Sequence, residues 1–171
     1  MLRGVTIRSL DVNGQPSANG KFVLMSMGMS NASQEFCARA GTVCDAWTFS
    51  GKAAVDPAVN HTTLYIANGA AGGQTADLWD DPTDTNYNRV RDQVLAPAGL
   101  SEAQVQVIGL QVVRRTPTIG LPDANADAYV LLGWLGGVVR SAKTGIARQA
   151  GVRPIRVAFS EGNSPQAAIH P

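Results

Sequence analysis

A glycine, a serine and an asparagine follow the first long apolar run of the chain, and together they could support nucleophilic chemistry. The largely apolar run 22–27 leads into Gly28, and Ser30 and Asn31 follow closely. Many α/β hydrolytic enzymes present a nucleophilic hydroxyl on a Gly-x-Ser turn that follows a buried strand. The segment therefore predicts Ser30 as a nucleophile, although a plain turn serine or an N-cap serine has the same local pattern.

The rest of the chain alternates between apolar segments and helical patterns. We expect strands at 22–26, 63–67, 104–108 and 154–159, and helices at 33–40, at 87–96 and within 123–150. Strands that are joined through helical crossovers form parallel sheets with helices on both faces. The pattern therefore predicts an α/β fold, in which Gly133, Gly136 and Gly137 allow the last helix to pack closely.

Three turns that follow the first three strands contain a glycine beside polar residues. They are the segments 28–31, 68–75 and 109–111. In open parallel sheets, ligands bind at the carboxyl ends of the strands. We therefore expect the three turns to form one site, although Gly72 and Gly73 could equally serve only to permit a tight turn with positive φ.

Two of these turns carry a resemblance to a known family. The sequences of 28–31 and of 68–75 resemble blocks one and two of the SGNH (GDSL-type) hydrolase superfamily, and the similarity extends over roughly residues 10–160. It points to a less-studied bacterial branch of that superfamily. The resemblance implies a three-layer α/β/α fold with a flavodoxin-like parallel sheet of four to five strands. It also implies hydrolysis of carboxylic esters without a cofactor.

The resemblance assigns roles to individual residues. It makes Ser30 the nucleophile and, through its backbone N–H, one donor to the oxyanion, with the N–H of Gly73 as a second donor. The family's third donor is the Asn of a Gly-x-Asn-Asp block, but this chain has Gly109, Leu110 and Gln111 there. Gln111 is therefore the expected third donor. Several donors that converge on one oxygen are what a tetrahedral intermediate needs.

The catalytic base is where the chain departs most from the family. The family places an Asp-x-x-His block near its C-terminus, and here His170 precedes Pro171 while Ala167 stands at the position of the aspartate. The nearest upstream acid is Glu161, and His61 precedes the second strand, at the wrong end of the sheet. Two hypotheses follow. One is an esterase with Ser30 and an unassisted His170 that favours small acyl groups. The other is a weak or inactive domain that binds a ligand.

Composition bounds the function further. The chain has 171 residues, 44% of them hydrophobic and 16% charged, with a net charge of +1, which is typical of one globular domain. That charge gives no electrostatic footprint for nucleic acid. The apolar stretch 129–139 is too short to cross a bilayer, and no signal peptide is visible, so no membrane partner is expected. We expect a small-molecule ester as substrate and leave the cellular location open, secretion included.

The ends of the chain suggest a shortened family member or a gene fragment, with one SGNH-like domain over residues 1–171 that is reduced at both ends. The strand expected at 154–159 would then form an exposed edge, which favours pairing with another chain. We therefore expect a homodimer, built through that strand edge or through the glycine-containing helix. The acids Asp80, Asp81 and Asp84 surround Pro82 and predict a solvated turn rather than a metal site.

Two cysteines, Cys37 and Cys44, stand close together in the chain. On one continuous helix they would lie about 10 Å apart, which is too far for a bond. Gly41 and Thr42 between them favour a helix end, which would allow a small disulfide-closed loop. Two buried free thiols remain the alternative.

Overall fold

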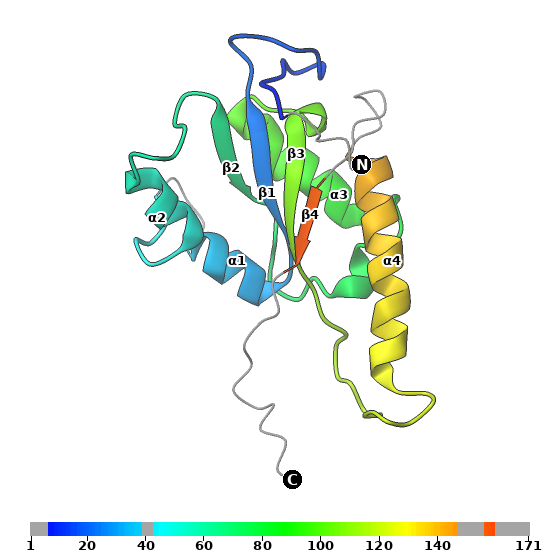
Figure 1. The fold of residues 1–171 in the computed structure, drawn as a ribbon. Helices are drawn as coiled ribbons and strands as arrows, with labels where there is room; N and C mark the ends of the chain where they lie inside the picture. The colour runs from blue at the N-terminus through cyan, green and yellow to red at the C-terminus, as the bar shows by residue number, and fades with distance from the viewer. Residues whose placement is uncertain (1–6, 39–42, 147–155, 160–171) are drawn as a thin grey trace, which may run out of the picture.

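The computed structural model describes residues 7–38, 43–146 and 156–159 of the chain. In these ranges, strands and helices alternate along the sequence around a parallel sheet (Figure 1). The predicted α/β class is therefore confirmed. None of the helices in the described ranges is both long enough and apolar enough to span a membrane.

The sheet has the strand order β2-β1-β3-β4, and every pairing in it is parallel. Its strands are β1 (Phe22–Gly28), β2 (Leu64–Asn68), β3 (Val105–Gln111) and β4 (Arg156–Phe159). β1 lies between β2 and β3, and its Val23, Met25 and Met27 are fully buried. A strand that is flanked on both sides and covered on both faces requires a nearly continuous apolar run, as in 22–27. Since all strands run the same way, their carboxyl ends meet at one edge.

One face of the sheet is covered by α1 (Ser30–Cys37), which packs on β1 and β3. Gly109 of β3 has no side chain beneath this helix, and a Cβ there would lie 3.3 Å from the ring of Phe36. On its outer side, Phe36 contacts Phe49 of α2 (Phe49–Val55), with ring centroids 4.9 Å apart. Gly109 therefore lets α1 approach the sheet at the end of the strands where Ser30 lies.

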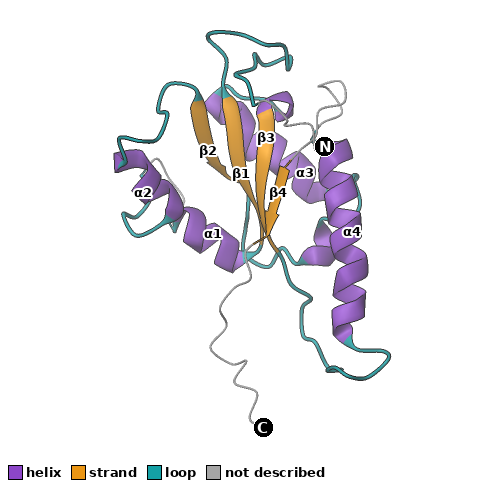
Figure 2. Ribbon diagram, in the orientation of Figure 1, coloured by secondary structure: helices purple, strands orange, loops and turns teal. Residues whose placement is uncertain are grey.

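Further helices cover the opposite face of the sheet (Figure 2), and this side carries most of the hydrophobic core. Side chains alternate along a strand, so Ile108 and Leu110 point away from Gly109. They belong to a cluster with α3 (Thr85–Arg89), the π-helical segment Val90–Leu95 and α4 (Asp127–Gly145). Short 3₁₀ turns complete the connections at Ala76–Leu78, Ala96–Ala98 and Glu102–Gln104.

Of the three glycines that were predicted to allow close packing of the last helix, one lies in a close contact with another element. Gly137 of α4 is buried, and a Cβ there would lie 2.9 Å from Cβ of Asp80. Ser141, one turn later, donates a 2.7 Å hydrogen bond to the carbonyl of the same Asp80. A Cβ on Gly133, in contrast, would meet nothing within 4 Å, and one on Gly136 would meet the side chain of Arg140.

The helix boundaries differ from the predicted ones. α1 begins at Ser30 rather than at residue 33, whereas α4 lies within the predicted range 123–150, after an irregular loop at 112–126. α2 was not predicted, although Thr48 caps it by accepting a hydrogen bond from the Gly51 N–H. The predicted helix 87–96 splits into α3 and the π-helical segment. Residues 147–150 of the last predicted helix lie outside the described residues.

The two cysteines form a disulfide. Cys37 is the last residue of α1, Cys44 follows it by seven positions, and their Cα atoms are 4.7 Å apart. Of the two alternatives that the sequence left open, the disulfide is the one found. It ties the carboxyl end of α1 to the segment that leads into α2.

Candidate functional site

The turns after β1, β2 and β3 meet at the carboxyl edge of the sheet, as the sequence predicts. The N–H of Ala71, in the turn after β2, donates a 3.1 Å hydrogen bond to the carbonyl of Gly28. The N–H of Met29 donates a longer one, 3.4 Å, to the carbonyl of Gln111 at the end of β3. Both neighbouring turns are thus attached to the two residues that precede Ser30.

Gly28 is the residue that lets this junction form. Its φ is 140°, and a Cβ at this position would lie only 1.9 Å from the carbonyl oxygen of Gln111. A side chain is excluded both by the backbone conformation and by the close approach of β3. The glycine of the predicted Gly-x-Ser turn therefore serves the packing of β3 against the end of β1.

Ser30 is the first residue of α1 and not a turn or capping serine. The N-cap is Met29, whose backbone is extended and whose side chain makes no capping hydrogen bond. The Ser30 side chain is half-buried, and its hydroxyl makes no hydrogen bond with any described residue. The hydroxyl thus has no partner within the described part of the chain, while its backbone N–H belongs to the first turn of a helix, where N–H groups carry partial positive charge.

A buried polar network beneath Ser30 holds α1 against the sheet. The hydroxyl of Ser26 donates a 2.6 Å hydrogen bond to Oδ1 of Asn68 and accepts one of 3.2 Å from the Ala70 N–H. Nδ2 of Asn68 donates to the carbonyl and the hydroxyl of Ser33 in α1, at 2.9 and 3.3 Å. Sequence reasoning gave Ser26 no role because a serine within a strand pattern carries no signal of its partner.

The glycine-rich turn after β2 is tightly folded. Gly73 has φ 76°, and its carbonyl accepts hydrogen bonds from the Thr75 N–H and from the guanidinium of Arg115, both at 3.1 Å. The N–H of Gly73 makes no hydrogen bond with the described residues. Gly73 thus has the left-handed conformation that the sequence allowed, and its N–H is available to a ligand.

Gln111 ends β3 in register with Gly28. Its carbonyl is engaged by Met29, and its half-buried side chain makes no hydrogen bond with the described residues. Its side-chain amide is therefore free to donate, as expected of the residue that stands where the family has an asparagine.

The described residues contain no base beside Ser30. His61 precedes β2 at the amino end of the sheet, is exposed, and lies 3.0 Å through Nε2 from the carbonyl of Asp56. Its predicted exclusion from the site is confirmed. His170, the predicted base, and Glu161 and Ala167 lie outside the described residues.

The acidic turn after the 3₁₀ segment is solvated only in part: Asp81 is exposed, whereas Asp80 and Asp84 are half-buried. Asp81 accepts hydrogen bonds from the hydroxyl and the N–H of Thr83, which lower the pKa of its carboxyl. The pKa of Asp84 is raised, mainly by desolvation. No group of three or more potential metal ligands occurs among the described side chains.

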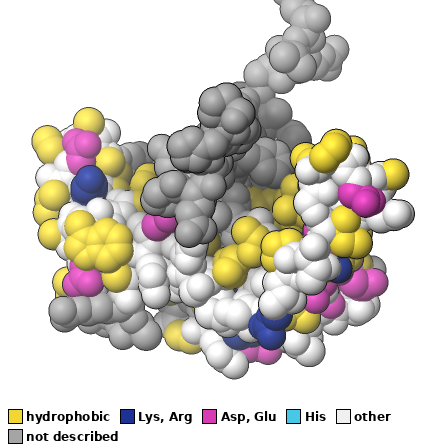
Figure 3. Space-filling view, turned by 90° about the horizontal axis from the view of Figure 1, so that it is seen from below, with side chains coloured by type: hydrophobic (Ala, Val, Ile, Leu, Met, Phe, Trp, Pro, Cys, Tyr) yellow, Lys and Arg dark blue, Asp and Glu magenta, His cyan; other side chains and the backbone are white. Residues whose placement is uncertain are grey.

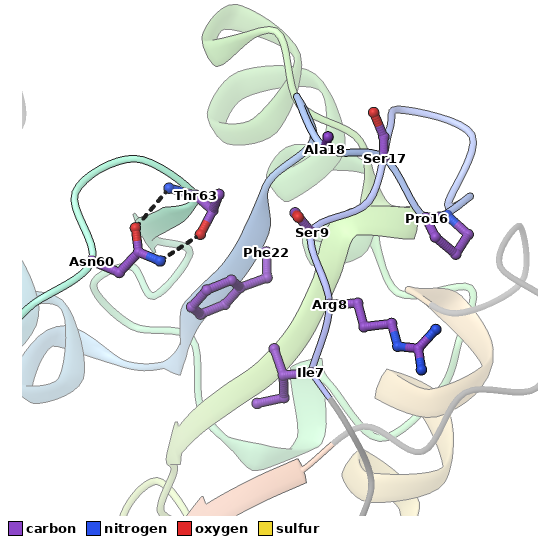
Figure 4. A pocket seen from close by; sticks show the side chains of 9 residues that line it. All are labelled: Ile7, Arg8, Ser9, Pro16, Ser17, Ala18, Phe22, Asn60 and Thr63. Atoms are coloured by element: carbon purple, nitrogen blue, oxygen red, sulfur yellow. Dashed lines mark hydrogen bonds between the residues drawn. The ribbon is translucent and has the colours of Figure 1, made fainter.

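A hollow of about 550 Å³ lies at the opposite edge of the sheet (Figure 4). Ile7, Ser17 and Phe22 line it together with Asn60 and Thr63, which hydrogen-bond to each other. Phe22 opens β1 and Thr63 precedes β2, so the hollow is at the amino ends of the strands. It is therefore separate from the site at Ser30. Figure 3 views the molecule from the carboxyl edge and shows hydrophobic side chains together with scattered charged ones among the coloured residues.

Comparisons with known proteins give no relative from which a function could be carried over to this chain. No family model, no curated protein and no solved structure matches the chain. What the site can do must therefore be inferred from its own geometry.

Proposed function

We propose that the chain is a serine hydrolase of the SGNH type that acts on carboxylic esters with small acyl groups. One observation carries the proposal: Ser30 begins α1 directly after the two residues that bond to the glycine-rich turn and to the end of β3, and its hydroxyl makes no hydrogen bond with a described residue. This is the position at which a nucleophile can attack a carbonyl carbon while backbone N–H groups face the carbonyl oxygen.

In the proposed reaction, the Ser30 oxygen attacks the ester carbonyl carbon and its proton passes to a base. The resulting oxyanion accepts hydrogen bonds from the N–H groups of Ser30 and Gly73 and from the side-chain amide of Gln111. The tetrahedral intermediate then collapses, and the alcohol leaves with the proton from the base. Water attacks the acyl-serine in the same manner and releases the acid. The loss of one oxyanion donor typically costs about 3 kcal/mol of transition-state stabilisation.

His170 is the proposed base. A serine-histidine pair without the acid that orients the histidine loses about 10⁴ in rate relative to a full triad. We therefore expect slow turnover and a preference for activated esters, whose leaving groups need little protonation. No cofactor is required for this chemistry.

The finer architecture belongs to the same proposal. We infer three α/β/α layers around a flavodoxin-like sheet of four to five strands. We also infer a homodimer, formed through the edge at β4 or through α4. Tyr129 and Leu132 support the helix as the interface, because they are 54% and 66% exposed, and apolar side chains exposed on one helix favour association.

A second function is favoured by one observation: the described residues place no histidine or carboxylate against the Ser30 hydroxyl. In that case the site binds an acylated or carbohydrate ligand without hydrolysing it. The free N–H of Gly73 and the amide of Gln111 would then bind a carbonyl of the ligand.

Hydrolysis of 4-nitrophenyl acetate separates the two functions. The esterase predicts turnover above background that Ser30→Ala abolishes and Ser17→Ala leaves unchanged. Ser17 is a suitable control because it lies at the amino end of the sheet, beside the hollow. Equal rates for the wild-type protein and Ser30→Ala would reject the esterase and leave the binding function.

A further inference from the structure

Two consecutive arginines follow β3 and differ in how they are paired. The guanidinium of Arg114 forms an ion pair with Asp127, the first residue of α4, whose side chain is 7% exposed. It also lies 5.8 Å from the centre of the Trp134 ring. The charge of Arg114 is thus neutralised within the fold.

Arg115 has no such partner. It is exposed, and no carboxylate of a described residue lies within ion-pair distance of it. Its one hydrogen bond with a described residue, of 3.1 Å, goes to the carbonyl of Gly73. A guanidinium has five N–H donors in a planar fork, so most of the donors of Arg115 have no partner among the described residues. An unneutralised cation therefore lies directly against the turn that carries the Gly73 N–H.

The backbone around Arg115 is anchored on both sides. Before it, the carbonyl of Val113 accepts a 3.0 Å hydrogen bond from the N–H of Ala76, just after the glycine-rich turn. After it, the N–H groups of Thr118 and Ile119 donate to the carboxylate of Asp127. The first contact holds the backbone before Arg115 against the glycine-rich turn, and the other two hold the backbone after it against α4.

We propose that Arg115 binds a carboxylate of the substrate, so that the preferred substrates are esters that carry a carboxylate near the scissile bond. This proposal deepens the proposed function. It rests on that function for the hydrolysis of the ester, whereas the binding of a carboxylate does not depend on it. An arginine fork pairs with both oxygens of a carboxylate, which gives orientation as well as affinity. The bound carboxylate would place the ester carbonyl beside Gly73 and Ser30.

The test compares two esters that differ in this charge, 4-acetoxybenzoate and its methyl ester. The measured quantity is the ratio of their kcat/KM values, and differences in leaving-group reactivity cancel when this ratio is compared between variants. Arg115→Gln should lower the ratio about tenfold, the value of one good charged hydrogen-bonding contact. Arg115→Lys should lower it less, because an ammonium keeps the charge but not the fork. Arg8→Gln, an exposed arginine near the amino edge, should leave the ratio unchanged.

Calorimetric titration of Ser30→Ala with the same two compounds tests the inference without hydrolysis. Here Ser30→Ala should bind 4-acetoxybenzoate about tenfold more tightly than the methyl ester, and adding Arg115→Gln should abolish the difference. Charge-dependent binding without turnover in the wild-type protein would refute the esterase and support the carboxylate site. Turnover in the wild-type protein, together with an unchanged ratio in Arg115→Gln, would support the esterase and refute the carboxylate site. An equal fall of the kcat/KM ratio in Arg8→Gln, or no detectable binding of 4-acetoxybenzoate, would overturn the inference.

Discussion

The hydroxyl of Ser26 and the side-chain amide of Asn68 are joined by a 2.6 Å hydrogen bond under the first turn of α1. Ser26 is fully buried, and among the described residues its hydroxyl has two hydrogen-bond partners, Asn68 and the Ala70 N–H. The bond orients the Asn68 amide so that its nitrogen donates to Ser33, three residues after Ser30. The position of the candidate nucleophile thus depends on a polar contact between β1 and the neighbouring strand β2.

We predict that Asn68→Ala destabilises the protein by about 1–3 kcal/mol, because it leaves the buried hydroxyl of Ser26 without its acceptor. The free energy of unfolding from urea denaturation measures this change. Asn88→Ala is the matched control: Asn88 is exposed on α3, and its replacement should change the free energy by less than about 0.5 kcal/mol. Equal effects of the two substitutions would contradict the structural role of Asn68.

Gly28→Ala should destabilise by at least about 3 kcal/mol, since it combines a strained backbone with a clash. The added Cβ would lie 1.9 Å from the Gln111 carbonyl at φ 140°. Gly72→Ala, in the facing turn, is the control, because a Cβ at that position meets nothing within 4 Å. Thermal unfolding of both variants should show a large loss for the first and almost none for the second. A wild-type melting temperature for Gly28→Ala would show that β3 does not approach β1 as described.

Reduction of the disulfide should lower the free energy of unfolding by about 2 kcal/mol, because opening this short loop restores freedom to the unfolded chain. The bridge joins Cys37 to Cys44, seven positions apart. Chemical denaturation with and without dithiothreitol measures the loss, and the double variant Cys37→Ser, Cys44→Ser should be insensitive to the reductant. Two free thiols in the unreduced protein, detected by alkylation and mass spectrometry, would rule out the bridge.

Glu102 gives a prediction for the pH dependence of stability. Desolvation raises the pKa of its carboxyl, an effect that Arg91 opposes and Asp92 reinforces. The folded state therefore holds this proton more tightly than the unfolded state, so stability falls as the pH rises above about 4, the ordinary range of a glutamate. Glu102→Gln removes this loss and should gain about 0.5 kcal/mol over wild type between pH 4 and pH 7, since the group is half exposed. The same gain in Glu35→Gln, on exposed α1 surface, would contradict this origin.

The sheet was predictable from the sequence because its strands are short apolar runs that end at glycine or polar residues. The central strand 22–26 is the clearest case, and the structure extends it only to Gly28. The helices were less predictable, since their ends depend on contacts with distant residues. α4 begins at Asp127 where Arg114 pairs with it, and α2 contains Gly51 and Lys52, which interrupt any apolar period.

The site was predictable in its strand-end glycines and in Ser30, but not in its supports. The glycines indicate tight turns from the local sequence alone, whereas the hydrogen bonds of Ser26 and Arg115 join residues more than 40 positions apart. Polar side chains give no sequence signal of such partners. The same limit applies to the Arg115 guanidinium, which becomes a candidate for substrate binding only when its neighbours are known.

The most direct test of the central claim is covalent labelling of Ser30. A fluorophosphonate reacts with an activated serine, loses fluoride and leaves a phosphonyl group on the hydroxyl oxygen, which peptide mass spectrometry locates. The account predicts a single adduct on the peptide that contains Ser30, abolished by Ser30→Ala and retained in Ser17→Ala. No adduct at Ser30 after prolonged exposure, or equal labelling of other serines, would contradict it.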